Sequence, residues 1–198
     1  MSLVPMIIET SGRGGERAMD IQSRLLRDRT IFITGQIETN MAQIIVAQIL
    51  FLQSESPEQP IIIFINSEGG SVYAGMSIFS TLRHCKCPIH VYGMGLCASM
   101  GALLLQAGDD GHRYVLPYTT VMIHSVSGGT GRSTVWDAEI QMEEMIRLND
   151  ELTNIFVQRN SKGKTFQELK SIMSRDHYLS PDMAIELGVI DKMVESKK

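Results

Sequence analysis

Residues 93–105 read GMGLCASMGALLL and join two predicted elements of regular structure. The residues before them, 88–92, are mostly β-branched and aromatic, which predicts a buried strand. The residues after Ser99 are apolar helix formers, and Gly108 closes the run. Ser99 therefore falls where a strand ends and a helix begins, beside backbone N–H groups that lack an intrahelical partner. This position suits a serine nucleophile next to an oxyanion hole, and it equally suits a helix N-cap.

Strands and helices are predicted to alternate on both sides of Ser99. Hydrophobic patterns place strands at about 30–35, 60–66, 113–116, 119–123 and 189–194, and helices at about 16–29, 39–52, 71–84, 165–174 and 180–188. The alternation predicts an α/β fold of repeated β-α units with a mostly parallel sheet. Binding sites in such sheets lie at the carboxyl ends of strands, so a turn over 67–71 is expected near Ser99.

A longer helix is predicted over about 133–160. At 1.5 Å per residue it is roughly 40 Å long, similar to the diameter of the whole domain, so we expect it to project. Its apolar face, which includes Trp136 and Ile140, then needs a partner, and a second copy of the chain is the simplest one. A glycine-rich break that folds the helix back is the alternative. Residues 1–15 are expected to form an irregular arm.

The composition fits one globular domain over 1–198. The chain is 43% hydrophobic and 20% charged, with a net charge of -4 that disfavours nucleic acid as a partner. Its three cysteines argue against a disulfide framework and fit a reducing compartment. Cys85 and Cys87 lack the second pair that a zinc site needs, so both are interpreted as buried thiols. We expect neither a secretory signal nor a membrane span.

A serine nucleophile needs a base, and the base needs a carboxylate that orients it. His124 ends the strand predicted at 119–123 and opens a polar, glycine-rich loop. Asp176 lies in a linker before a helix that Ser180 caps, and His177 beside it is a rival base. Sequence spacing does not rank the two histidines, so a Ser–His–Asp site is compatible with the residues without being fixed by them.

Several motifs, in one order, resemble those of a single family. They are Val4–Glu9 with Arg13-Gly14, Asp20–Leu26, Ile65–Gly70, Gly95–Ala102, Met122–His124, and Arg175-Asp176 with Leu179-Ser180. Over nearly its full length the chain resembles the ClpP family, the proteolytic subunits of ATP-dependent Clp proteases. The resemblance implies the crotonase-like ClpP fold, with a handle region at about 125–160 and an axial amino-terminal arm at 1–15.

The resemblance also implies a serine endopeptidase without a metal or cofactor of its own. Ser99 would be the nucleophile, His124 the base and Asp176 its orienting carboxylate, while the amides of Gly70 and Met100 would bind the oxyanion. Two rival hypotheses remain. A crotonase-type acyl-CoA enzyme would use the same oxyanion amides without the serine, and an inactive ring subunit would only act as a scaffold.

The partners are likewise implied by the resemblance. Two stacked heptameric rings would enclose a cytoplasmic chamber that contacts neither nucleic acid nor membrane. An AAA+ unfoldase of the ClpX, ClpA or ClpC type would use ATP to feed it unfolded polypeptides. The unfoldase would dock at Ile62, Phe64, His84, Tyr92 and Tyr114. Departures from the family pattern fall at Glu68, His84, Ser125-Val126 and Ser174, which leaves the unfoldase and the stability of ring stacking open.

Overall fold

The structure is a computed structural model that describes residues 5–10, 16–129 and 131–195. Within these residues a seven-stranded sheet runs in the order β3-β4-β5-β6-β9, with β7 paired to β5 and β8 paired to β7. Every pair in this sheet is parallel except β7–β8. The predicted α/β fold with a mostly parallel sheet is thus confirmed. Its strands are β3 (Thr30–Ile37), β4 (Ile61–Gly70), β5 (Ile89–Ala98), β6 (Arg113–Val115), β7 (Thr120–Ile123), β8 (His177–Leu179) and β9 (Lys192–Met193).

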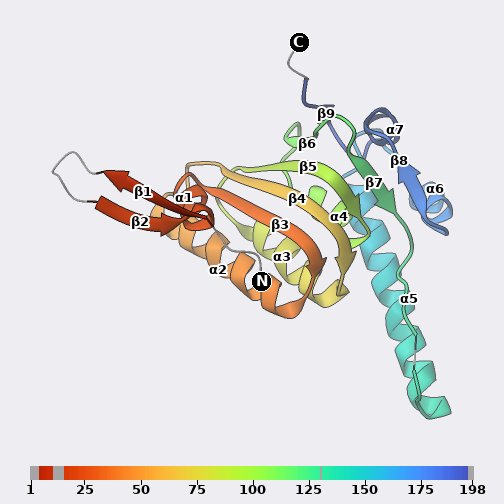
Figure 1. Cartoon of the computed structure of the whole chain (residues 1–198). Coiled ribbons are helices and arrows are strands. Elements are labelled where there is room, and N and C mark those ends of the chain that lie inside the picture. Colours follow the sequence, from red (N-terminus) through yellow and green to blue (C-terminus); the bar gives the residue numbers. More distant parts are fainter. Residues whose placement is uncertain (1–4, 11–15, 130, 196–198) are drawn as a thin grey trace.

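Helices cover one face of the sheet (Figure 1). Alternate β4 residues Ile61, Ile63 and Ile65 are fully buried there, beneath α2 (Thr39–Glu55) and α3 (Val72–His84). A short helix, α4 (Met100–Leu105), packs against α3 and β4, and all six of its residues are buried. Because side chains alternate along a strand, the half-buried Phe64 points to the opposite face.

The longest helix, α5 (Val135–Gln158), has 24 residues and is about 36 Å long. Its carboxyl-terminal half is anchored to the domain by Leu148, Leu152 and Phe156, which are buried. Its amino-terminal turns extend away from the body, as Figure 1 shows, and Trp136 there is 75% exposed. The projection predicted for this helix is therefore confirmed. Two short helices, α6 (Phe166–Ile172) and α7 (Pro181–Leu187), follow it.

The amino-terminal prediction was wrong in part. Residues 6–10 are not irregular but form β1 (Met6–Thr10), which pairs antiparallel with β2 (Glu16–Asp20). The helix predicted from residue 16 begins only at α1 (Ile21–Arg27), because the carboxylate of Asp20 accepts the backbone N–H of Ser23 at 2.8 Å and caps it there. The parts of the predicted arm at residues 1–4 and 11–15 lie outside the described residues.

Several strand boundaries also differ from the prediction, and β3, which was expected to end at Gly35, runs on to Ile37. The turn expected at 67–71 is strand up to Gly70, and the strand expected at 88–92 runs on to Ala98. In both strands the pairing register shifts within the added residues. Beyond the shift, Gly70 of β4 pairs with Ile37 of β3, and Ala98 of β5 pairs with Met122 of β7. The last strand covers only Lys192–Met193, while the linker before Ser180 contains the unpredicted β8. Each of these differences arises because a strand forms only where another strand, distant in the sequence, pairs with it.

Candidate active site

Ser99 occupies a strained turn between β5 and α4. Its φ of 55° lies in the left-handed region, which non-glycine residues rarely adopt. Two backbone bonds hold this turn: the N–H of Ser99 donates to the carbonyl of Met122 at 2.9 Å, and the N–H of Leu103 donates to the carbonyl of Ser99 at 3.0 Å. Ser99 is the N-cap residue of α4 by position, as the alternative interpretation expected, but its side chain makes no capping bond to the helix. Its hydroxyl is instead turned toward His124.

The structure brings Ser99, His124 and Asp176 into one row. The Nε2 atom of His124 lies 2.9 Å from the Oγ atom of Ser99, and its Nδ1 atom lies 3.1 Å from an Oδ1 oxygen of Asp176. The imidazole side chain is 18% exposed and the carboxylate 57% exposed. Of the two candidate bases, His124 is the one bonded to the serine. The imidazole can therefore accept the Ser99 proton at Nε2 while an Nδ1–H points at a carboxylate.

Sheet pairing explains how residues so far apart in sequence meet. Met122 lies opposite Ala98 in the parallel β5–β7 pair, which sets His124 beside the turn at Ser99. His177 lies opposite Ile123 in the antiparallel β7–β8 pair. Asp176, which precedes His177, therefore lies on the side of His124 away from Ser99. The row is thus built on three neighbouring strands, whose hydrogen bonds fix its geometry.

The glycine pair at the end of β4 lies against the same turn, as predicted. A Cβ atom on Gly69 would fall 2.7 Å from the Cβ of Ser99 and 3.1 Å from the backbone nitrogen of Met100. Gly70 lines a cavity together with Ser99 and Met100. Met100 is the first residue of α4, so its N–H has no intrahelical acceptor and carries part of the positive end of the helix dipole.

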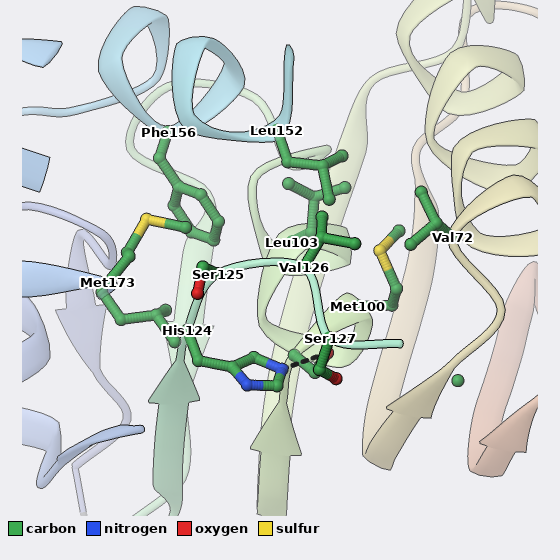
Figure 2. A pocket seen from close by; sticks show the side chains of 13 residues that line it. Val72, Met100, Leu103, His124, Ser125, Val126, Ser127, Leu152, Phe156 and Met173 are labelled. Atoms are coloured by element: carbon green, nitrogen blue, oxygen red, sulfur yellow. Dashed lines mark hydrogen bonds between the residues drawn. The ribbon is translucent and has the colours of Figure 1, made fainter. Parts of the chain in front are cut away.

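The cavity beside Ser99 is mainly apolar. Figure 2 shows side chains from several elements around His124 and its hydrogen bond to Ser99: α3, α4, the segment after β7, α5 and the residue that follows α6. The apolar residues that line it are Val72, Met100, Leu103, Ile123, Val126, Leu152, Phe156 and Met173. Of these apolar side chains, the sequence analysis singled out only Val126, as part of a departure from the family pattern after His124, although Leu152 lies on the predicted apolar face of the long helix. Ser99, the candidate nucleophile, thus lies next to a pocket that suits an apolar side chain.

Two backbone bonds fix the segment that follows His124. The N–H of Ser125 donates to the carbonyl of Met173 at 2.6 Å, and the N–H of Val126 donates to the side-chain oxygen of Asn149 at 3.0 Å. These bonds tie the segment to the end of α6 and to α5. Ser125 and Val126, which depart from the family pattern, are thus wall residues of the cavity.

A family comparison agrees with this architecture: a model of the Clp protease family matches residues 13–197. The chain belongs to the Clp protease family. The fold, with its mixed α/β layers and mostly parallel sheet, is the one expected for Clp proteases, and membership makes the chain a Clp-type protease. The resemblance inferred from the motifs is therefore confirmed.

The docking residues expected for a Clp protease fall on two surfaces of this chain. Phe64, Tyr92 and Tyr114 stack in a row on the outer face of the sheet, with ring centroids 5.2 and 4.8 Å apart. Ile62 lies on β4 in register with His90, and Phe32, which the sequence analysis missed, extends the row at 5.4 Å from Phe64. The fifth residue, His84, ends α3 on the helical side and lines a separate cavity between α2 and α3.

The structure also bears on the cysteines and on the length of the helices. Cys85, Cys87 and Cys97 are all free thiols, but only Cys87 and Cys97 are buried, so the prediction of two buried thiols at 85 and 87 was wrong for Cys85. Among the described residues, no helix is both long enough and apolar enough to cross a membrane.

Proposed function

We propose that this Clp protease is a serine endopeptidase in which Ser99 is the nucleophile, His124 the general base and Asp176 the orienting carboxylate. The observation that carries the proposal is the unbroken row from Ser99 Oγ through His124 to Asp176, with contacts of 2.9 and 3.1 Å. Both distances are within the range over which a proton can pass from hydroxyl to imidazole and an imidazolium can be stabilised.

The proposed reaction follows from these positions. Ser99 Oγ attacks the peptide carbonyl while its proton moves to His124 Nε2, and Asp176 stabilises the imidazolium through Nδ1–H. His124 then gives the proton to the leaving amine, and water hydrolyses the acyl-serine with His124 again acting as base. The amides of Gly70 and Met100 are proposed to bind the oxyanion, a donor pair of which each member is typically worth about 100- to 1000-fold in rate. Because these residues supply every proton and charge, we propose that no metal or cofactor takes part.

The apolar cavity beside Ser99 supports a preference among peptide substrates. A substrate whose carbonyl lies at Ser99 would place its preceding side chain among Leu103, Leu152 and Phe156. Burying an apolar side chain there contributes about 1.5–3 kcal/mol, whereas a charged one would lose its hydration without a partner. We therefore expect cleavage after medium-sized apolar residues of unfolded polypeptides.

Assembly into two stacked heptameric rings in the cytoplasm is part of the proposal. The projecting turns of α5 expose Val135, Trp136, Ile140 and Ile146 at 55–78%, an apolar face that another copy of the chain would cover. The aromatic row on the sheet and His84 on the helical side would form one docking pocket for an AAA+ unfoldase only when contributed by neighbouring copies. That unfoldase would supply the ATP-driven step.

A fluorophosphonate probe tests the chemistry directly. We expect one adduct on Ser99, identified by mass spectrometry, and cleavage of a fluorogenic peptide that falls about 10⁴- to 10⁶-fold in Ser99→Ala. Ser127→Ala, which alters another serine lining the same cavity, is the matched control and should retain both labelling and cleavage.

The rival hypotheses predict different results in the same experiment. Absence of a Ser99 adduct, or protection of Ser99 from labelling by coenzyme A, would favour an acyl-CoA enzyme. A purified assembly that cleaves the peptide no faster than Ser99→Ala would favour an inactive scaffold.

A further inference from the structure

A pair of thiols lies where α3 ends and β5 begins, outside the catalytic site. Cys85 follows the last residue of α3, and its φ and ψ of -64° and 138° are extended rather than helical. Lys86 and Cys87 then form a bend before β5, and the Cys85 and Cys87 side chains are in hydrogen-bonding contact with one another. A bend brings alternate Cα atoms closer than the roughly 7 Å of a fully extended chain, which is the upper limit for a disulfide.

The two thiols have different surroundings. Cys85 is half-buried and lines the cavity between α2 and α3, where small molecules can reach it. Cys87 is 3% exposed, and its sulfur lies 3.3 Å from Nη2 of Arg29 and 3.6 Å from the carbonyl of Ser56. One cysteine is therefore accessible, and the other is held behind it beside a positive charge.

The guanidinium of Arg29 is itself held firmly. It donates to backbone carbonyls at 3.0–3.1 Å, those of Leu52, Ser56, Gln59 and Pro60. The Nη2 atom of this guanidinium and the carbonyl of Ser56 hold the Cys87 sulfur in one position. Cys87 is thus positioned to act as the resolving thiol for any adduct that forms on Cys85.

We propose that Cys85 and Cys87 are a reversible redox modification site that closes to an intrachain disulfide when the chain meets a small-molecule disulfide such as oxidised glutathione. The Cys85 thiolate attacks one glutathione sulfur, forms a mixed disulfide and releases a glutathione thiolate, which takes up the proton lost from Cys85. The Cys87 thiolate then attacks the Cys85 sulfur and displaces the second glutathione thiolate, which takes up the proton lost from Cys87. Two cysteine thiols are oxidised and one glutathione disulfide is reduced.

The first step, attack of Cys85 on the glutathione disulfide, should be faster at higher pH. Burial raises the pKa of the Cys85 thiol above its ordinary value of 9.0, and contact with the Cys87 thiol raises it further. The rate of adduct formation should therefore increase with pH throughout the neutral and mildly alkaline range. Cys97 is an internal control, because burial raises its pKa to about 12 and its side chain is 0% exposed.

Peptide mapping of the folded, full-length chain tests the proposal. Trypsin cuts after Arg83, Lys86 and Arg113, so Cys85 is released in fragment 84–86, while Cys87 and Cys97 share fragment 87–113. In a Cys97→Ser background, treatment with oxidised glutathione should join the two fragments through a disulfide, and dithiothreitol should separate them. The intact chain should lose two hydrogen atoms without retaining glutathione.

Two variants complete the test, each made in the Cys97→Ser background. Cys87→Ser should stop at a stable glutathione adduct on Cys85, and Cys85→Ser should acquire neither adduct nor disulfide. The proposal is overturned if Cys85 keeps glutathione while Cys87 is intact, if the disulfide joins two chains, or if both thiols remain open to alkylation after oxidation. The mapping in the Cys97→Ser background decides the matter even if a variant at the buried Cys87 fails to fold.

Discussion

At the scale of single residues, the site depends on a strained serine and on the glycine that leaves room for it. A non-glycine residue in the left-handed region costs about 1–3 kcal/mol and persists only when its neighbours hold it there. At Ser99 the neighbours are the carbonyl of Met122 and the first turn of α4. Gly69 adds a steric condition, because only a residue without a side chain can pass so close to Ser99.

Gly69→Ala should impair catalysis far more than it impairs folding elsewhere. The new methyl would lie 2.7 Å from Ser99 Cβ and 2.9 Å from the Ala98 carbonyl oxygen, in backbone with a φ of +98°. A shift of about 1 Å at a reacting group can cost about 100-fold, so peptide cleavage should fall at least that much.

Gly163→Ala is the matched control for this substitution. Its φ is +67°, but nothing lies within 4 Å of the added Cβ, so the change adds backbone strain alone, about 1 kcal/mol. Peptide cleavage and thermal melting should be measured for both variants. Equal activity in the two would contradict a steric role for Gly69.

At the scale of elements, a buried ion pair fastens the carboxyl-terminal segment to β6. The guanidinium of Arg113 bonds the carboxylate of Asp191 and also the side chain of Gln106, and the two charged side chains are 2% and 10% exposed. Burial by itself would raise the pKa of Asp191, but the hydrogen bonds and charge of Arg113 outweigh it and lower that pKa. The pair is therefore charged in the folded protein.

Asp191→Asn should destabilise the fold by about 3–5 kcal/mol, because it leaves the buried Arg113 charge without its counter-ion. Asp110→Asn is the control. That carboxylate also pairs with an arginine, Arg159, at 2.9 Å, but it is 86% exposed, so its loss should cost at most about 1 kcal/mol. Urea unfolding of both variants measures the difference, and equal midpoints would contradict the role assigned to burial.

A surface network joins α3 to α5 and responds to acid. Glu144 accepts hydrogen bonds from Arg147 and from the hydroxyl of Tyr73, and these bonds lower its pKa from 4.5 to about 2. A depressed folded-state pKa contributes stability above the unfolded value and loses it as pH falls through the folded value.

The thermal stability of the wild type should therefore exceed that of Glu144→Gln above pH 4.5, and the difference should vanish as pH falls toward 2. The effect should be small and weaken with salt, because Glu144 is on the surface. Melting curves at several pH values and two salt concentrations test this. A difference that grows on acidification would contradict the assignment.

At the scale of the whole molecule, α5 divides into an anchored half and an unpartnered half. Its buried residues all come from Leu148 onward, whereas Trp136 and Ile140 near its start are 75% and 64% exposed. A projecting apolar face of this kind is stable in water only when another surface covers it. We expect that surface to be the same helix region of a second ring.

Ile140→Asp should weaken the association of rings without unfolding the chain. The substitution places a charge in the expected interface, yet in one chain the side chain is already mostly exposed. Native mass spectrometry should show single rings or smaller species in place of the double ring. Gln141→Asp adds the same charge at the neighbouring exposed position and should leave the double ring intact.

Trp136 gives an independent measurement of the same event. It is the only tryptophan of the chain, so selectively excited tryptophan fluorescence reports on this face alone. Its emission should shift to shorter wavelength on ring stacking and return on dissociation. Emission that is the same in both states would mean that another surface joins the rings.

The sequence by itself determined the alternation of strands and helices, the parallel sheet, the projecting helix and the position of Ser99 between a strand and a helix. These features depend on local periodicity and on residues near one another in the chain, such as the isoleucines of β4 and the small residues around Ser99. Family motifs added His124 and Asp176, but spacing alone could not choose between His124 and His177.

Only the tertiary structure decided which groups meet. His124 contacts Ser99 because β7 pairs with β5, and Asp176 reaches His124 because the unpredicted β8 pairs with β7. The extension of β4 to Gly70, the apolar cavity and the partners of Cys87 likewise depend on contacts between distant segments. Such contacts are fixed by sheet register and core packing, which are properties of the folded chain rather than of any short stretch of it.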